Sequence, residues 1–308
     1  MTAPPTGQLA RPPTGDLALL AVAVVAISTS GPLIAACAAP ALAIAFWRCL
    51  LGSAATAVPV ALWHRREVAA LTARHWRLMG LSGLLLGAHF AAWVPSLRLT
   101  SVASSTALVA TQPVWAAAIA ARRGVRVPRS AWVGIALAMA GVLILTGIDF
   151  ATTPKALVGD LLALAGAILA AAYVTIGETV RSDTSNPTYT AICYGASAAG
   201  LLALVALLRV PLTGFSTRDW MLILAITLGA QLLGHTVVNR VLATTSATVV
   251  SLAILLEMPG STLIAAAWLN QIPTVTVVPA LVLVLAGIAL VIRATTGPND
   301  PPSEAPPA

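Results

Sequence analysis

The segment ATVVSLAILLEMPGSTLIAAAW, residues 247–268, is an apolar run of 22 residues with one carboxylate, Glu257, at its centre. A bilayer core about 30 Å thick is crossed by roughly 20 apolar residues in a helix, so this segment predicts a membrane span. An acid at mid-depth costs at least about 2.5 kcal/mol, and we therefore expect Glu257 to face protein or water. Pro259 removes a backbone N–H and frees a carbonyl one turn earlier. Together the two residues indicate a polar cavity here.

The composition of the whole chain is that of a membrane protein. Of its 308 residues, 58% are hydrophobic and 9% charged, against roughly 25% charged residues in an ordinary soluble domain. The net charge of +7 comes from basic residues in short loops between apolar segments, which excludes nucleic-acid binding. The three cysteines, Cys37, Cys49 and Cys193, lie in apolar stretches and predict neither a disulfide framework nor a metal site.

Ten apolar segments predict an all-α integral membrane protein with ten transmembrane helices. They cover residues 17–37, 40–62, 78–97, 102–121, 131–148, 157–177, 189–208, 220–240, 247–268 and 276–292. Residues 1–14 and 294–308 are too rich in small polar residues and proline to pack a core, and we expect disordered tails there. A cleaved signal peptide at the first segment is disfavoured, because only Arg11 precedes it and nine further segments follow.

Basic residues predict the orientation. With the N-terminus inside, twelve arginines fall in inner loops and tails, and four basic residues fall in outer loops. This bias places both termini in the cytoplasm. The inner set is Arg11, Arg65, Arg66, Arg74, Arg77, Arg122, Arg123, Arg126, Arg129, Arg181, Arg240 and Arg293, and the outer set is Arg98, Lys155, Arg209 and Arg218.

The chain also repeats itself at offsets of 144 to 146 residues. The recurring stretches are Gly15-Asp16-Leu17 and Gly159-Asp160-Leu161, Thr100-Ser101 and Thr245-Ser246, and Ala140-Gly141-Val142 and Ala286-Gly287-Ile288. Five spans are an odd number, so the second copy must enter the membrane upside down relative to the first. We therefore expect two inverted five-helix repeats, residues 15–148 and 155–293, with a substrate site between them.

Motifs around these landmarks resemble a known family over about residues 15–293. They are Leu99-Thr100-Ser101-Val102-Ala103, Gln112-Pro113-Val114-Trp115, Ala243-Thr244-Thr245-Ser246, Leu256-Glu257-Met258-Pro259 and Ala286-Gly287-Ile288. They are similar to the EamA family of the drug/metabolite transporter superfamily, which usually places serine or glutamate just before the proline of the fourth helix in each repeat. The family's Gly-Glu pair after that helix is replaced here by Arg123-Gly124-Val125-Arg126 and Asn270-Gln271.

The resemblance implies a divergent member whose substrate need not be that of its siblings. It implies an exporter of small metabolites such as amino acids, or of toxic compounds, in the bacterial cytoplasmic membrane.

Glu257 is the strongest candidate for a functional residue. A carboxylate in low dielectric could bind a proton or a substrate amine by turns. The alternative is a structural carboxylate bonded to a neighbouring helix. Gln112 is its counterpart in the first repeat and can donate and accept hydrogen bonds without titrating, but it could equally hold two helices together. Pro113 and Pro259 are the helix-breaking prolines beside them.

His89 and His235 are related by the repeat offset, so we expect them on opposite sides of the membrane midplane. A neutral imidazole can relay protons or hold a carboxylate, and it can also serve as a hydrogen-bonded packing residue. Arg48 lies about nine residues into the second segment and could clamp a substrate carboxylate or pair structurally with another helix. The sequence contains no HxxxH or CxxC spacing, so it does not favour a metal site.

Aromatic rings could line the cavity and select aromatic or hydrophobic substrates, although such rings more often pack or contact lipid. The candidates are Trp47, Trp93, Trp115 and Tyr173. Asp16 and Asp160 begin segments in the two copies and are interpreted as helix caps.

The leading hypothesis is a secondary transporter, and the rival is a membrane enzyme or sensor. No HExxH, GxSxG or paired-aspartate motif supports an enzyme, and the tails are too short for a sensor's output domain. Without a Walker motif, ATP is not expected as the direct energy source, and ion or proton coupling or facilitated diffusion remains. No cofactor is expected. The sequence indicates neither the substrate, the direction of transport nor the oligomeric state.

Overall fold

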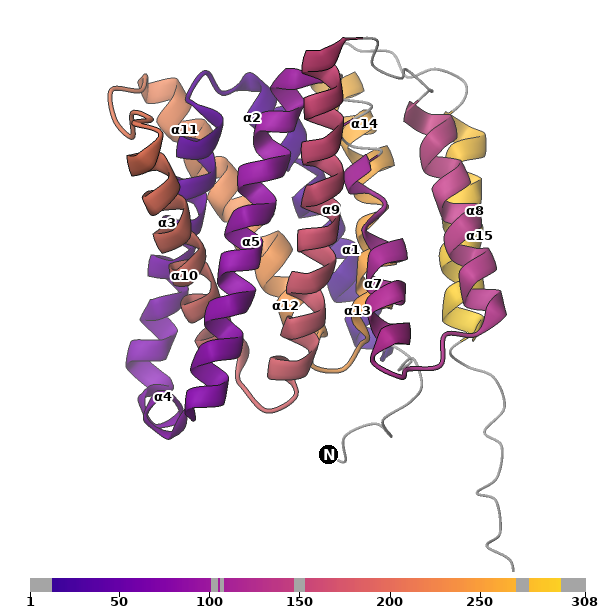
Figure 1. Ribbon diagram of the computed structural model, residues 1–308, viewed down its shortest axis with the longest axis horizontal. Helices are drawn as coiled ribbons and strands as arrows, with labels where there is room; N and C mark the ends of the chain where they lie inside the picture. The colour runs from indigo at the N-terminus through magenta and orange to yellow at the C-terminus, as the bar shows by residue number, and fades with distance from the viewer. Residues whose placement is uncertain (1–12, 101–104, 106–107, 147–152, 270–276, 295–308) are drawn as a thin grey trace, which may run out of the picture.

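The computed structural model describes residues 13–100, 105, 108–146, 153–269 and 277–294, and the regular elements in these ranges are all helices (Figure 1). The first half contains α1 (Thr14–Ser28), α2 (Ser30–Ala36), α3 (Ala41–Trp63), α4 (Arg65–Ala70), α5 (Ala73–Leu99), α7 (Gln112–Arg122) and α8 (Arg129–Thr146). The second half contains α9 (Pro154–Arg181), α10 (Asn186–Leu207), α11 (Thr217–Ile226), the π-helix η1 (Thr227–His235), α12 (Thr236–Val241), α13 (Ala247–Ile254), α14 (Glu257–Leu269) and α15 (Val277–Ala294).

Six stretches in the described part are long and apolar enough to cross a membrane as helices: Thr14–Ala36, Ala41–Trp63, Ala73–Leu99, Pro154–Arg181, Asn186–Leu207 and Thr217–Val241. Shorter apolar helices cover Arg129–Ile144, Ala247–Ser261 and Val282–Val291. The chain is therefore an all-helical, multi-pass membrane protein. Each predicted apolar segment overlaps a helix, but the number of ten spans stays a prediction. The two expected disordered tails lie outside the described residues, apart from residues 13, 14 and 294 at their edges.

Hydroxyl side chains, rather than the two aspartates, provide the side-chain caps at the starts of α5 and α9. Thr153 caps α9 by accepting a hydrogen bond from the N–H of Ala156, and Thr72 caps α5 in the same way. The residue before α1 is Pro13, which provides no side-chain bond. Neither aspartate is therefore an N-cap residue: Asp16 lies in the first turn of α1, where a carboxylate suits the helix N-terminus, whereas Asp160 lies beyond the first turn of α9 and the interpretation fails there.

Those aspartates instead join the two halves of the chain. Thr100, at the end of α5, donates to Asp160 Oδ1 on α9 over 2.7 Å, and Thr244, after α12, donates to Asp16 Oδ2 on α1. Each bond runs from the end of the third segment of one half to the first helix of the other half. The two halves thus make the same contact reciprocally.

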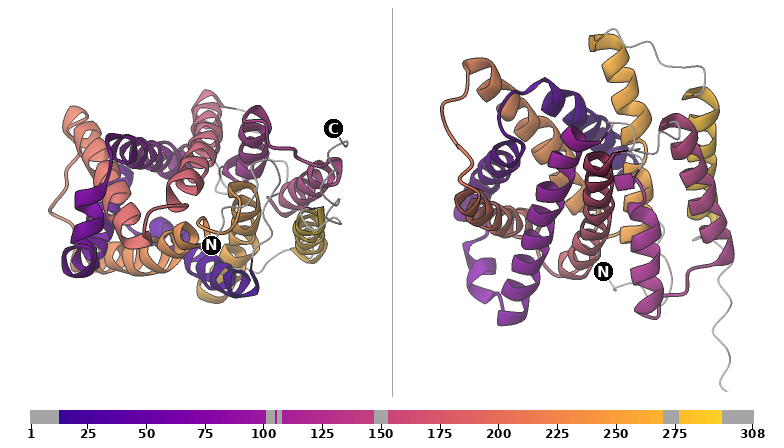
Figure 2. Two further views of the ribbon diagram at one scale, coloured as in Figure 1. Left: turned by 90° about the horizontal axis from the view of Figure 1, so that it is seen from below. Right: turned by 45° about the horizontal axis from the view of Figure 1, so that its top comes forward.

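The helices of the two halves also pack directly against each other. α3 packs on α10, and α8 packs on α15 at one edge of the bundle, as Figures 1 and 2 show. Where α8 crosses α15, a Cβ on Gly287 would lie 2.5 Å from the carbonyl oxygen of Gly134. A Cβ on Gly134 would lie 2.7 Å from that of Gly287. Small residues therefore allow the two backbones to touch, as in other membrane bundles.

A carboxylate outside the spans holds the turn between α9 and α10. Glu67, on α4, accepts hydrogen bonds from the Ser185 amide at 2.6 Å, the Ser185 hydroxyl and the Thr188 hydroxyl at 2.8 Å. Partial burial opposes its charge, but these bonds prevail and lower the pKa of Glu67.

The lowered pKa predicts a pH dependence of stability. The contribution of Glu67 is fully present above the pKa of an unfolded glutamate and is lost as the pH falls through the lower folded pKa. Thermal unfolding in detergent from pH 7 to pH 3 is expected to show an acid-dependent loss that is smaller in Glu67→Gln. An identical loss in both proteins would contradict the assignment.

Candidate functional site

Three of the predicted apolar segments are interrupted. The first is broken at Thr29, between α1 and α2. The ninth is broken between α13 and α14, and the eighth changes from α11 through the π-helix η1 to α12. Interrupted helices free backbone groups at membrane depth, and π-helical turns are frequent at functional sites. The region where these segments meet is therefore the natural place to look for a site.

Two prolines account for the first two breaks. Pro32 lacks the N–H that would bond the Ser28 carbonyl, and Ser261 of α14 donates to that oxygen over 2.8 Å instead. Pro259 likewise lacks the N–H that would bond the Leu255 carbonyl, and the N–H of Met258 donates to that oxygen over 3.2 Å instead. A Cβ on Gly260 would overlap the Ser28 hydroxyl, so only glycine lets α14 approach α1 this closely. The two interrupted segments thus contact each other at their breaks.

Arg48, on α3, is fully buried at the centre of this region. Its Nε donates to Gln231 Oε1 of η1 over 2.9 Å, and Nη1 donates to the Ser30 hydroxyl of α2 over 3.4 Å. Its Cζ lies 4.2 Å from the centre of the Phe90 ring on α5, a cation–π contact. Four helical elements therefore hold one guanidinium in a fixed position.

Both predicted histidines lie beside Phe90. The His235 ring stands edge-on to Phe90, with centroids 5.6 Å apart, and the His89 ring neighbours Phe90 at 5.0 Å. His89 stacks on Trp93 at 5.8 Å, and its Nδ1 lies 2.9 Å from the Gly166 carbonyl. Each histidine also interacts electrostatically with Arg48. The structure thus brings together Arg48, His89, Trp93 and His235.

Glu257 is the first residue of α14, directly after the break. Its side chain is partly exposed, and in the described part of the chain its carboxylate accepts no hydrogen bond and makes no ion pair within 4 Å. It does interact electrostatically with Arg48. The bond to a neighbouring helix that the structural alternative predicts is therefore not seen among the described residues.

Several polar atoms of the cluster are buried without a partner among the described residues. These atoms are Arg48 Nη2, Gln231 Nε2, His235 Nδ1 and Trp93 Nε1. Buried polar groups are nearly always hydrogen-bonded, so unpartnered ones require an explanation, such as a ligand. We call Arg48, Gln231, His235, His89, Trp93 and Glu257 the central cluster.

Other predicted candidates lie outside the central cluster. Gln112 opens α7 with Pro113 and donates through Nε2 to Ser251 of α13 over 3.0 Å, which holds two helices together. Trp115 Nε1 donates to the hydroxyl of Thr111, the residue directly before its own helix, over 3.1 Å. Tyr173 is buried and donates to Asn239 Oδ1 over 2.6 Å. Trp47 donates to the Leu212 carbonyl over 2.8 Å and packs on Trp220.

Tyr173→Phe is expected to affect stability rather than transport. The change leaves the buried side-chain oxygen of Asn239, Oδ1, without the hydroxyl that donates to it over 2.6 Å, which costs about 1–3 kcal/mol. Thermal unfolding should therefore shift downward while the apparent KM for any transported compound stays unchanged. A changed substrate preference at unchanged stability would instead place Tyr173 in the substrate path.

Sequence reasoning missed Gln231, Ser30 and Phe90. All three are uncharged, so none stands out in an apolar segment as Arg48 or Glu257 does. Two signals were available. Gln231 precedes His235 by four residues, which places both on neighbouring turns of one helix. Gly31-Pro32 marks the helix break at which Ser30 lies.

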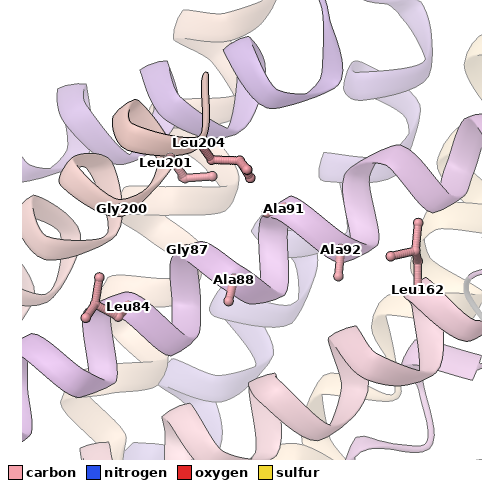
Figure 3. A pocket seen from close by; sticks show the side chains of 9 residues that line it. All are labelled: Leu84, Gly87, Ala88, Ala91, Ala92, Leu162, Gly200, Leu201 and Leu204. Carbon is pink, nitrogen blue, oxygen red and sulfur yellow. The ribbon is translucent and has the colours of Figure 1, made fainter. Parts of the chain in front are cut away.

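An apolar pocket of about 410 Å³ lies elsewhere, between α5, α9 and α10 (Figure 3). It is lined by Leu84, Gly87, Ala88, Ala91, Ala92, Leu162, Gly200, Leu201 and Leu204. None of these side chains carries a polar group, so the pocket offers a ligand only apolar side-chain contacts. Within the described ranges no three His, Cys, Asp or Glu side chains gather as a metal site would need.

Comparisons with known proteins point to one family. The model of the EamA-like transporter family matches this chain twice, over residues 14–147 and 157–293. A solved structure titled only "Crystal structure of protein" superposes with a TM-score of 0.75 at 19% identity, covering 90% of this chain and 97% of its own. At that identity the likeness concerns the fold alone. No match was found among curated protein sequences.

Proposed function

The chain belongs to the EamA-like transporter family of the drug/metabolite transporter superfamily, and on that premise we propose that the central cluster binds the substrate of a secondary transporter. The observation that carries the proposal is the meeting of three interrupted segments around Arg48 and Glu257, with buried donors left open. Substrate and ion sites of secondary transporters are typically built where discontinuous helices meet near the bilayer midplane.

The two halves, residues 15–148 and 155–293, act as inverted five-helix repeats within ten spans. The reciprocal Thr100–Asp160 and Thr244–Asp16 bonds and the Gly134–Gly287 crossing support this arrangement. Rocking of one repeat against the other would expose the cluster to each side in turn. His89 and His235 then occupy equivalent positions on either side of the midplane.

The transported compounds are small metabolites, amino-acid-like or hydrophobic and toxic, and the direction is export across the bacterial cytoplasmic membrane. Protons drive the export through Glu257. Its partly exposed carboxylate has no hydrogen-bond or ion-pair partner in the described residues and can therefore bind and release a proton. Facilitated diffusion without ion coupling is the second candidate, since the neutral Gln112 stands at the repeat-equivalent position of Glu257.

Everted membrane vesicles test the proposal. An imposed pH gradient should drive uptake of at least one compound from an amino-acid and drug panel, and vesicles lacking the protein should show none. A protonophore should abolish this uptake if transport is proton-coupled and leave equilibration intact if the protein is a facilitator. The proposal would be refuted if the vesicles neither accumulated nor equilibrated any compound of the panel.

Cysteine labelling tests the orientation. Arg66 lies on α4 and Arg123 follows α7 at one end of the bundle, whereas Lys155 begins α9 at the other (Figure 1). In intact cells an impermeant reagent should reach a cysteine at 155 but not one at 66 or 123, because the bias of basic residues places that end in the cytoplasm. Labelling of position 155 only after the membrane is opened would refute this topology.

A further inference from the structure

We propose that the compound bound by the central cluster carries a carboxylate, held by Arg48 and Gln231 with His235 beside them. The inference rests on the proposed function, because it names the chemistry of the substrate for that same site. Its starting point is the charge of Arg48, which stays protonated at any physiological pH. In the described part of the chain no carboxylate lies within 4 Å of the guanidinium. The site therefore holds a buried cation that has no ion-pair partner among the described residues.

The open atoms around this cation are donors. Arg48 Nη2 has no partner, while Nε and Nη1 are engaged by Gln231 and Ser30. Because Gln231 Oε1 accepts from Arg48 Nε at 2.9 Å, its amide orientation is fixed and Nε2 remains as a second open donor. His235, one turn further along η1, adds an open ring nitrogen that donates in one tautomer. A ligand that satisfies these atoms must supply acceptor oxygens.

The guanidinium is also held before any ligand arrives. Phe90 covers one face at 4.2 Å, and the bonds to Gln231 and Ser30 fix its edge. A guanidinium fixed in this way matches the paired oxygens of a carboxylate. An ammonium group would meet the like charge of Arg48, and an uncharged apolar compound would leave the donors buried and unsatisfied. The donor set thus favours a carboxylate over an amine or an apolar compound.

Glu257 fits the same account. It interacts electrostatically with Arg48 without pairing with it. A substrate carboxylate bound to Arg48 would therefore compete with the Glu257 carboxylate for electrostatic attraction to the same guanidinium.

The test measures thermal unfolding of the purified full-length protein in detergent. The ligands are benzoate, benzylamine and benzyl alcohol, which share a phenyl ring and differ in their polar group. Acetate and inorganic phosphate are further probes. Benzoate is expected to raise the unfolding temperature in a dose-dependent way, and benzylamine and benzyl alcohol are not. Gln231→Glu keeps the acceptor for Arg48 Nε but replaces the open donor with negative charge. It should raise the apparent dissociation constant of benzoate at least roughly tenfold.

Gln112→Glu is the matched control, since Gln112 bonds to Ser251 away from the cluster, and it should leave benzoate binding unchanged. If Gln231→Glu does not fold, Gln231→Met removes both the open donor and the acceptor of Arg48 Nε without adding charge, and it should also weaken benzoate binding. Stabilisation by benzylamine or phosphate without benzoate, no shift with benzoate, or an undiminished benzoate shift in the Gln231 variants would overturn the inference. A vesicle screen that finds only amines without a carboxylate would overturn it while leaving the transporter proposal standing.

Discussion

Replacing Glu257 by Gln is expected to abolish the pH dependence of transport while leaving the protein folded. The substitution keeps the size and the hydrogen-bonding capacity of the side chain and removes only its titration. Because Glu257 has no hydrogen-bond or ion-pair partner in the described residues, the fold gains little from its charge. Uptake driven by a pH gradient should therefore fall to the level of vesicles without the protein. The variant should unfold at the wild-type temperature.

Glu178→Gln provides the matched control. Glu178 is a second carboxylate in the bundle, on α9, but it accepts a hydrogen bond from the N–H of Ala247 over 3.3 Å and takes no part in the central cluster. Its variant should keep the wild-type pH profile. Transport by Glu257→Gln with an unchanged pH profile would refute the coupling role, and joint loss of stability and transport would favour a structural one.

Arg48→Lys is expected to weaken substrate binding roughly 10- to 100-fold, equivalent to the loss of one bond to a charged group. Lysine keeps the charge but not the planar fork. It cannot bond Gln231 and Ser30 and still offer a fixed open donor as Arg48 does. The effect should appear as a raised apparent KM in vesicle uptake, with a smaller loss of thermal stability.

Arg181→Lys is the corresponding control. Arg181 is also buried, but its Nε makes a single bond to the Asn239 carbonyl at 2.9 Å, away from the cluster. A lysine can replace that bond, so the apparent KM should not change. Equal effects of the two substitutions on KM would mean that Arg48 acts only through the fold.

Sequence reasoning located the charged members of the site because charge is rare in apolar segments. Arg48 and Glu257 stand out for this reason, His89 and His235 stand out by the repeat offset, and each apolar segment found by hydropathy overlaps a helix. Depth in a segment does not reveal which face a side chain occupies. Gln112, Trp115 and Tyr173 were therefore grouped with the cluster although each bonds elsewhere.

The geometry that organises the cluster could not be read from apolar periodicity. The π-helix η1, which carries Gln231 and His235, contains two glycines but no proline, and nothing in its apolar pattern distinguishes it from an α-helix. Its register depends on packing, including the approach of Gly234 to Ile27 of α1. Asp16 and Asp160 illustrate the same limit. Their place near helix starts suggested caps, whereas their partners, Thr244 and Thr100, lie in the other half of the chain.

The central claim is that the cluster around Arg48 is reached from both sides of the membrane in turn. It is tested most directly by a cysteine at position 257 in a background where Cys37, Cys49 and Cys193, all buried, are replaced by alanine. An impermeant thiol reagent is applied to right-side-out and to everted vesicles. We predict labelling from both faces, reduced by benzoate in each case. Labelling from one face only, or from neither, would contradict the account.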